Sequence, residues 1–263
     1  MSLNPYKIKG RVCVVTGSAR SIGLDVATRY ASYGAKVYML DYSENVLASA
    51  QMLRDKGWDA TGKVVDVTDH DGVIACFDEI VAEAGPIYAL VNCAGVGGSC
   101  AFENTTPDMW QRVFSINVFG TVNCIQGAIR SMREAREGKI INFSSKTGKT
   151  GSKLMAVYGS SKGAIVILTQ SLAMEYAEHN VHVNCVCPDV IKGTGMWDGT
   201  VVQTYARDYG ITEDEVNAMY EKKVPLGHFA TMEDVTDVVA FLTISGEDCT
   251  GQSINITGGR FMH

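Results

Sequence analysis

Short runs of β-branched and other apolar residues alternate with longer amphipathic stretches along most of the chain. Nearly continuous apolar runs are typical of parallel strands that are buried on both faces. We predict strands at 11–16, 36–40, 62–65, 88–92, 139–143, 181–186 and 253–256, and helices at 22–33, 44–56, 70–84, 107–132, 157–178, 212–222 and 232–244. Strand followed by helix, repeated, predicts right-handed βαβ units and an α/β fold with a doubly wound sheet.

One segment, 193–230, breaks this alternation, and the chain of 263 residues shows no internal repeat, low-complexity tract or linker. We therefore predict one domain, 1–263. An excursion after a strand's carboxyl end lies where an open α/β sheet binds its ligand. Because long excursions in compact domains are usually functional, we predict a helical lid over a substrate. An extra helical hairpin packed on the core is the alternative.

Composition and charge exclude several classes of protein. The net charge is −6 and the pI is near 5.4, whereas a nucleic-acid binder needs a basic face. No window is apolar enough for a membrane span, and we see no signal peptide in residues 1–17. The eight Cys form no CxxC pair, and apart from His179 and His182 the histidines are dispersed. We expect reduced thiols, a cytoplasmic protein and no metal site.

The stretch "VVTGSARSIG" (14–23) follows the first predicted strand and opens the first helix. Gly17 and Gly23 would let the turn point its N–H groups at a pyrophosphate on the helix N-terminus, although a Gly-rich turn alone is weak evidence. Asp41 ends the second strand, where an acidic residue meets the ribose hydroxyls of a dinucleotide. A carboxylate there repels a 2′-phosphate, so we expect NAD, while Arg20 favours NADP. A residue in the N-cap region of the helix that follows is the alternative role for Asp41.

Two further turns belong to the same predicted edge of the sheet. Asp66 follows the third strand and is a candidate for the adenine end of the cofactor, with a turn or capping role as the alternative. "VNCAG" (91–95) ends the fourth strand. Asn92 can tie neighbouring turns together, while Ala94 and Gly95 allow a close approach of backbone to cofactor; a plain strand-ending turn is the alternative.

Tyr158 and Lys162 are four residues apart and so share one face of a predicted helix. Ser145 follows a strand, and Asn117 lies on the preceding helix. A phenol with an ordinary pKa of about 10 is a poor base at neutral pH, but a nearby ammonium favours the phenolate. Ser145 would hold a substrate oxygen, and Asn117 would anchor a water that relays protons to Lys162. This set suits oxidation of an alcohol, with hydride leaving for a nicotinamide.

In order and spacing, the Gly-rich turn, "NCAG", Asn117, Ser145 and the YxxxK pair resemble the short-chain dehydrogenase/reductase family over essentially the whole chain. The resemblance implies a single Rossmann-type domain with about seven parallel strands, a homotetramer, and catalytic roles for Asn117, Ser145, Tyr158 and Lys162. It implies cofactor contacts from Gly17, Arg20, Ser21, Ile22, Gly23, Asp41, Asp66, Val67, Asn92, Ala94, Gly95, Tyr158, Lys162, Pro188, Ile191 and Thr194. Two departures are Ser21, in place of a usual Gly, and Asp189, in place of the Gly of a usual Pro-Gly.

The stretch "SSKTGKTGSK" (144–153) places Lys146, Lys149 and Lys153 beside these residues. They are either a solvated loop or an anion site for a substrate phosphate. This stretch is similar to sorbitol-6-phosphate dehydrogenases, and "GTGMW" (193–197) looks like acetoin reductases and polyol dehydrogenases. The resemblance implies a small alcohol or ketone substrate, namely a sugar alcohol or its phosphate, contacted by Ser145, Lys149, Met196 and Trp197. Acetoin, a sugar acid or a hydroxysteroid, and a non-catalytic NAD-binding protein, are the alternatives.

The interpretation of Asp41 predicts the cofactor preference. Asp41→Ala removes the carboxylate that repels a 2′-phosphate, so the ratio of kcat/KM for NAD to that for NADP should fall. Steady-state rates at 340 nm with each cofactor measure this ratio. A wild-type enzyme that already prefers NADP would contradict the interpretation.

Overall fold

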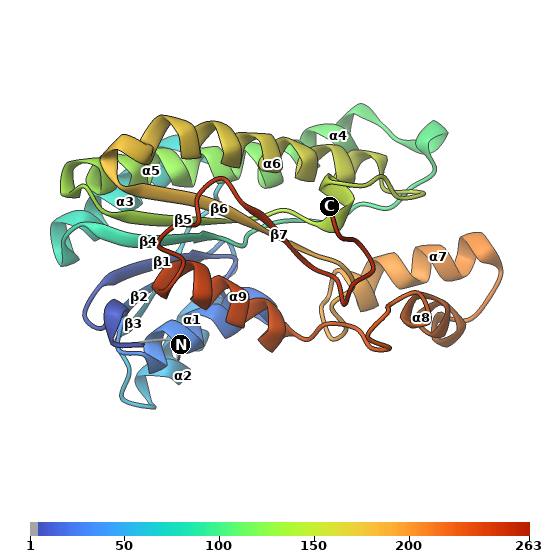
Figure 1. The fold of residues 1–263 in the computed structure, drawn as a ribbon, viewed down its shortest axis with the longest axis horizontal. Helices are drawn as coiled ribbons and strands as arrows, with labels where there is room; N and C mark the ends of the chain where they lie inside the picture. Colours follow the sequence, from blue (N-terminus) through green and yellow to red (C-terminus); the bar gives the residue numbers. More distant parts are fainter. Residues whose placement is uncertain (1–4) are drawn as a thin grey trace.

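The computed structural model describes residues 5–263, which form one domain built on a parallel seven-stranded sheet (Figure 1). All seven predicted strands are present. Their bounds are β1 Val12–Thr16, β2 Lys36–Asp41, β3 Ala60–Val64, β4 Ile87–Asn92, β5 Gly138–Phe143, β6 Val181–Pro188 and β7 Ser253–Ile256. The strand order is β3-β2-β1-β4-β5-β6-β7, which is the predicted Rossmann-type arrangement.

The order of the strands reverses next to β1, which pairs with β2 on one side and β4 on the other. The loops that leave these strands therefore run to opposite faces of the sheet. A crevice opens between such loops at the carboxyl ends of the strands, and open α/β sheets bind their ligands there.

Helices cover both faces of the sheet, and each layer has its own buried apolar cluster. One layer is built from α1 Ser21–Ser32, α2 Asn45–Arg54 and α9 Met232–Ile244. The other layer contains α3 His70–Ala84, α5 Gly120–Ala135 and α6 Ala156–Tyr176. In Figure 1 the two layers lie above and below the strands. Because residues on both faces of β1, β2 and β4 are buried, these strands read as continuous apolar runs.

The predicted helix 107–132 is in fact two helices. α4, Pro107–Phe114, is separated from α5 by a π-helical turn at Ser115–Phe119. Such turns insert one extra residue and are frequent at functional sites. This turn contains Asn117, one of the four residues predicted to be catalytic. Hydrophobic periodicity cannot reveal a single inserted residue within an otherwise helical pattern.

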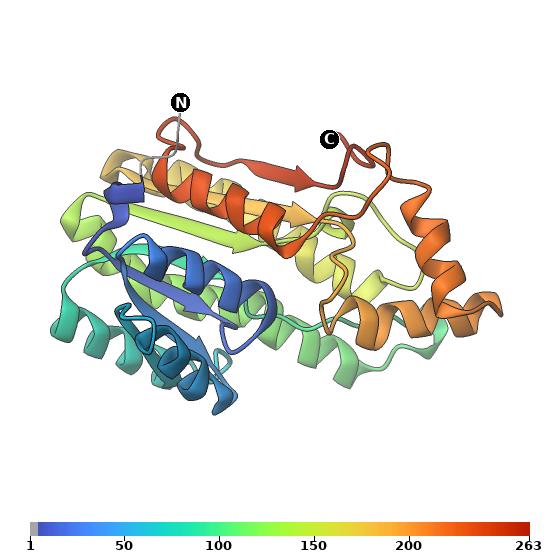
Figure 2. The ribbon, with the colours of Figure 1, turned by 90° about the horizontal axis from the view of Figure 1, so that it is seen from below.

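The 193–230 segment is helical, as predicted. It contains a π-helical turn at Trp197–Val201, α7 Val202–Tyr209 and α8 Glu213–Glu221. Figures 1 and 2 both place α7 and α8 beyond the carboxyl ends of the strands. Their apolar residues form a third cluster, which also contains Met155 and Tyr158. The segment therefore packs against the part of α6 that carries the predicted catalytic tyrosine.

Three expectations from the sequence concern a membrane span, a metal site and a signal peptide. No helix within residues 5–263 is long and apolar enough to cross a membrane. In the same part of the chain, no three His, Cys, Asp or Glu residues gather as metal ligands would. The expectation about a signal peptide falls partly on residues 1–4, which lie outside the described residues.

Packing of α1 against the β1–α1 turn predicts the effect of one substitution. A Cβ at Gly23 would lie 2.2 Å from the carbonyl oxygen of Gly17, so Gly23→Ala must displace backbone. We expect a loss of about 1–3 kcal/mol in unfolding free energy, which lowers Tm by roughly 2–12 °C. Gly199→Ala is the matched control, because a Cβ there meets no atom within 4 Å. Equal melting temperatures for the two variants would contradict this account of the turn.

Candidate active site

A cavity of about 700 Å³ runs along the carboxyl ends of the strands, from the β1–α1 turn to the α7–α8 segment. Most of the predicted site residues line it: Gly17, Arg20, Ser21, Ile22, Gly23, Asp41, Asp66, Val67, Ala94, Gly95, Ser145, Tyr158, Lys162, Pro188, Ile191, Thr194, Met196 and Trp197. The residues predicted to bind the nucleotide and the residues predicted to be catalytic thus line the same cavity. We call its two parts the nucleotide end and the substrate end. Asn92, Asn117 and Lys149 are not part of its wall.

The β1–α1 turn has the close packing that a dinucleotide cradle requires. Gly17 has φ 65°, and a Cβ on it would lie 2.8 Å from the Cα of Ala94. The Thr16 hydroxyl accepts a hydrogen bond from the N–H of Ala94 at 3.1 Å, which fixes the two neighbouring loops together. With no side chain at Gly17 or Gly23, the backbone at the start of α1 is open to a phosphate. The turn therefore fits a pyrophosphate.

Ser21, the first departure from the family pattern, keeps the conformation for which glycine is usual. Its φ is 55°, in the left-handed region that disfavours side chains. Its hydroxyl lies 3.7 Å from the sulfur of Met232 on α9, so the side chain is accommodated against that helix. The loop thus follows a left-handed path at this position despite the serine.

Both predicted acidic residues of the nucleotide end accept hydrogen bonds from loop residues. Asp41 accepts hydrogen bonds from the N–H groups of Ala19 and Ser43, each at 3.0 Å. Asp66 accepts from the N–H and the hydroxyl of Thr68, at 2.9 and 2.8 Å. Both carboxylates also line the cavity. Neither aspartate is the N-cap residue of α2 or α3, so the capping interpretation is wrong for both. A turn role and a ligand-facing role are compatible, because a carboxylate has acceptor capacity beyond two bonds.

Asn92 lies beneath the cavity and ties strands together. Its amide nitrogen donates to Asn142 at 2.9 Å, and the Asn142 amide donates in turn to the Thr169 hydroxyl at 3.0 Å. This buried chain joins β4, β5 and α6. These bonds join two strands and a helix, whereas the prediction for Asn92 named neighbouring turns, and Asn92 does not line the cavity in which a cofactor would bind.

Asn117 is fully buried and fastens the loop after β4. Its side-chain oxygen accepts from the N–H of Val96 at 2.8 Å, and its nitrogen donates to the Val96 carbonyl at 3.0 Å and to the Ser161 hydroxyl at 3.0 Å. The side-chain amide is thus used by the protein itself. Any water that Asn117 anchors would have to bind its backbone carbonyl, which already accepts a bond from Thr121 at 2.9 Å.

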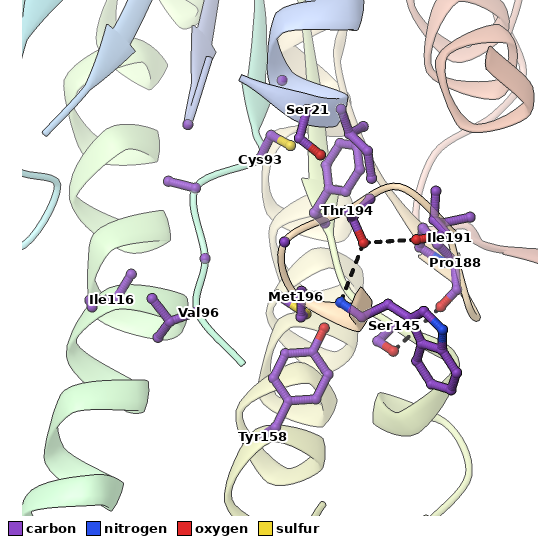
Figure 3. A pocket seen from close by; sticks show the side chains of 18 of the residues that line it. Ser21, Cys93, Val96, Ile116, Ser145, Tyr158, Pro188, Ile191, Thr194 and Met196 are labelled. Carbon is purple, nitrogen blue, oxygen red and sulfur yellow. Dashed lines mark hydrogen bonds between the residues drawn. The ribbon is translucent and has the colours of Figure 1, made fainter. Parts of the chain in front are cut away.

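The Ser145, Tyr158 and Lys162 side chains come together from two elements. Ser145 follows β5 in extended backbone, and Tyr158 and Lys162 lie on successive turns of α6. Figure 3 shows the Tyr158 hydroxyl pointing towards Met196 and Ser145 in the cavity. Lys162 donates to the carbonyl of Phe143 at 2.7 Å, and its nitrogen lies 5.8 Å from the centre of the Tyr158 ring.

Burial dominates the ionisation of this pair. It raises the pKa of Tyr158 to about 12, and a hydrogen bond with Ser145 acts in the opposite direction. Burial also lowers the pKa of Lys162 to about 8. The expectation that Lys162 would lower the pKa of the phenol is therefore not met, because desolvation outweighs any attraction between the two groups. At neutral pH the phenol is a proton donor.

The strand β6 and the segment after it form the wall opposite β4. Ser145 donates weakly to the carbonyl of Pro188 at 3.4 Å, and the Thr194 hydroxyl donates to the carbonyl of Ile191 at 2.8 Å (Figure 3). Trp197 is buried against Tyr220, donates to Asn217 at 2.8 Å, and still lines the cavity. Trp197 is thus both a core residue of the third apolar cluster and a residue of the cavity wall.

The three lysines of 144–153 point to three different places, which the sequence pattern did not resolve. Lys149, the predicted substrate contact, donates to the carbonyl of Ser253 on β7 at 3.1 Å and does not reach the cavity. Lys153 is exposed and pairs with Asp208 on α7 at 2.7 Å. Lys146 is buried and lines the cavity. The structure thus replaces Lys149 by Lys146 as the lysine at the site.

Sequence reasoning also missed the partner of Asp189. This aspartate lines the cavity and forms an ion pair with Arg260 at 2.8 Å, with both side chains largely buried. Burial raises the pKa of Asp189, and the attraction of Arg260 lowers it. A carboxylate in place of the usual glycine was the only available signal, and nothing in the sequence pointed to an arginine 71 residues further on.

Comparison with protein families gives one assignment that covers most of the chain. Residues 11–203 match the family described as short chain dehydrogenase. This range holds the β1–α1 turn, Asn117 and the Ser145, Tyr158 and Lys162 set. The match therefore includes each of the predicted catalytic positions.

Individual proteins similar to this chain act on several kinds of alcohol. A 2-(S)-hydroxypropyl-CoM dehydrogenase of Xanthobacter autotrophicus is 34% identical, over 96% of this chain and 97% of the relative. The NAD⁺-bound structure of a xylitol dehydrogenase has a TM-score of 0.92 and 33% identity, covering 96% of this chain and 100% of that one. A gluconate 5-dehydrogenase from Burkholderia cenocepacia, in complex with NADP and tartrate, has a TM-score of 0.90 and 28% identity, covering 99% and 98%.

Proposed function

The chain belongs to the short-chain dehydrogenase family and is an oxidoreductase acting on CH–OH groups, and we propose that it interconverts a secondary alcohol of a polyol and the ketone with NAD as cofactor. The substrate we propose is a sugar alcohol or its phosphate. One observation carries the proposal: the buried Tyr158 and Ser145 hydroxyls face the same cavity as the β1–α1 turn. A substrate oxygen between these hydroxyls would lie close to a cofactor that extends from the turn.

The chemistry follows from the positions of three side chains. A nicotinamide, when bound, supplies the acceptor or donor of hydride. In oxidation, Tyr158 takes the proton of the substrate hydroxyl as the carbon–hydrogen bond gives up its electron pair; in reduction, Tyr158 returns the proton to the new alkoxide. Ser145 orients the reacting oxygen. Lys162, fixed by the Phe143 carbonyl, attracts the phenolate, although burial outweighs this attraction and keeps the pKa of Tyr158 raised.

The preference for NAD rests on Asp41. Its carboxylate lines the cavity at the end of β2 and is held in place by two backbone N–H groups. A negative charge fixed there opposes a 2′-phosphate. Arg20 lines the same end of the cavity and acts in the other direction, and the similar solved structures include one with NAD⁺ and one with NADP.

The proposal of a polyol substrate is supported by the lining of the substrate end. Ser145, Thr147 and Ser152 contribute hydroxyl groups there, and Met196 and Trp197 contribute an apolar wall. Each of these hydroxyls is already bonded within the protein and keeps further hydrogen-bonding capacity, which the hydroxyls of a polyol would use and the apolar rings of a steroid would not. The similar xylitol and gluconate dehydrogenases also favour a polyhydroxylated substrate. A reductase or dehydrogenase for another ketone, such as acetoin or a sugar acid, is the alternative.

The lid, the oligomeric state, the location and a non-catalytic role complete the proposal. We propose that 193–230 acts as a lid, on the ground that Tyr205 and Trp197 line the cavity while belonging to the separate third apolar cluster. A homotetramer and a cytoplasmic location remain expectations from the family resemblance. A non-catalytic NAD-binding protein is less favoured, because binding alone would not require the Ser145, Tyr158 and Lys162 set.

Removal of one hydroxyl tests the mechanism. Tyr158→Phe removes the proton donor and keeps the ring, so kcat should fall by about 10²–10⁴-fold. Affinity for NADH, measured by fluorescence titration, should change by no more than a few-fold, which shows that the cavity is intact. Turnover of sorbitol, galactitol or 2,3-butanediol at the wild-type rate in this variant would rule the mechanism out.

The raised pKa of Tyr158 predicts different pH profiles for the two directions. Oxidation needs the phenolate, and with a pKa of about 12 its population rises throughout the accessible range. The rate of oxidation should therefore increase with pH, less steeply above about 8 where Lys162 loses its charge. Reduction needs the phenol and should not increase between pH 6 and 8. Initial rates in both directions at constant ionic strength measure this, and faster oxidation at pH 6 than at pH 8 would contradict it.

A further inference from the structure

The side chain of Lys146 is a buried ammonium group in the wall of the substrate end of the cavity. It directly follows Ser145, and its side chain is only 6% exposed. Its ammonium donates to the Ser152 hydroxyl at 2.5 Å and lies over the ring of Phe261, 4.3 Å from the centroid. These two contacts direct the side chain without neutralising its charge.

No carboxylate oxygen within residues 5–263 lies within 4.0 Å of the Lys146 ammonium. The nearest candidate is Asp189, whose attraction acts on Lys146 but whose carboxylate is bonded to Arg260 at 2.8 Å. Arg260 and Lys223 add positive charge around the same point. The group formed by Lys146, Asp189, Arg260 and Lys223 therefore carries three cations and one anion.

A buried ammonium without a counter-ion is costly, and proteins normally pair such groups or use them to bind ligands. Burial lowers the pKa of Lys146, as expected for a cation that lacks an ion-pair partner. An oxyanion in the cavity would remove this cost by forming a charge-assisted hydrogen bond with the free donors of the ammonium. The site thus carries an excess of positive charge, which an anionic ligand would neutralise.

We propose that the substrate carries an anionic oxygen group, a carboxylate or a phosphate, that binds to Lys146 while its reacting carbon lies between Ser145 and Tyr158. This inference rests on the proposed function for the position of the reacting carbon. Because Ser145 and Lys146 both line the cavity, one substrate would contact both side chains. The enzyme would then select a charged polyhydroxylated substrate over a neutral polyol of the same length.

The Asp189–Arg260 pair explains how a carboxylate can line an anion site. Arg260 neutralises Asp189 and is itself fixed over the rings of Tyr220 and Phe261, at 4.8 and 5.1 Å. The same arginine thereby connects the end of β6 to α8. Asp189 is consequently prevented from pairing with Lys146, which stays available to a ligand.

A binding experiment tests this without depending on turnover. Wild-type enzyme with saturating NADH is titrated by isothermal calorimetry with D-gluconate, sorbitol 6-phosphate and sorbitol at low ionic strength. We expect at least one of the two anions to bind roughly 10- to 100-fold more tightly than sorbitol, the range typical of a hydrogen bond to a charged group. The pattern between the anions separates a carboxylate from a phosphate. Anions that bind no more tightly than sorbitol would overturn the proposal.

Matched lysine variants assign the effect to one residue. Lys146→Met keeps the unbranched shape of the side chain with one heavy atom fewer and removes its charge. The ratio of anion to sorbitol affinity should therefore fall by roughly 10- to 100-fold, and Lys146→Arg should retain most of it. Lys149→Met is the control, since that lysine lies in the same loop but bonds to Ser253, and it should keep the wild-type ratio. An equal loss in both methionine variants would indicate a general electrostatic effect and overturn the assignment to Lys146.

The two proposals can fail separately. If anions bind through Lys146 but no alcohol is oxidised with NAD or NADP, the proposed reaction is wrong and the anion site stands. If sorbitol and gluconate are oxidised with equal kcat/KM in wild type and binding shows no dependence on Lys146, the reaction stands and the anion site is wrong.

Discussion

The buried side chain of Asn117 holds together the parts of the molecule on which the site depends. It bonds to both polar backbone groups of Val96 and to Ser161, and so connects the loop after β4, the π-helical turn and α6. Buried amides are costly unless all their groups are bonded, so this geometry is strongly specified. The positions of Tyr158 and Lys162, which lie on the same helix as Ser161, follow from this connection.

Burial has a different consequence at each ionisable group of the cavity. It keeps Tyr158 protonated, and it lowers the pKa of Lys162 and of Lys146, so both ammonium groups hold their protons less tightly. The common cause is desolvation, which disfavours the charged form of each group. A ligand that restores the missing charge or hydrogen bonds therefore interacts with the site more strongly than it would in water. The same physics links the proposed proton transfer to the proposed recognition of an anion.

Much of this arrangement could be predicted from local patterns. All seven strands and the order of strand and helix follow from apolar runs, because burial on both faces of a sheet requires them. Gly17 and Gly23 were predictable because only glycine tolerates the close contacts at the turn. The break at Ser115–Phe119 was not, since a single inserted residue scarcely alters the periodicity of a long helix.

The sequence by itself determined the fold class, the nucleotide-binding turn and the Ser145, Tyr158 and Lys162 set, since each depends on spacing within one or two neighbouring elements. Only the tertiary structure decided which lysine of 144–153 enters the cavity, because three lysines in one loop share the same local pattern. It also decided the ionisation of Tyr158 and the pairing of Asp189 with Arg260. Those properties arise from desolvation and from contacts between segments far apart in the chain, and neither is encoded in local spacing.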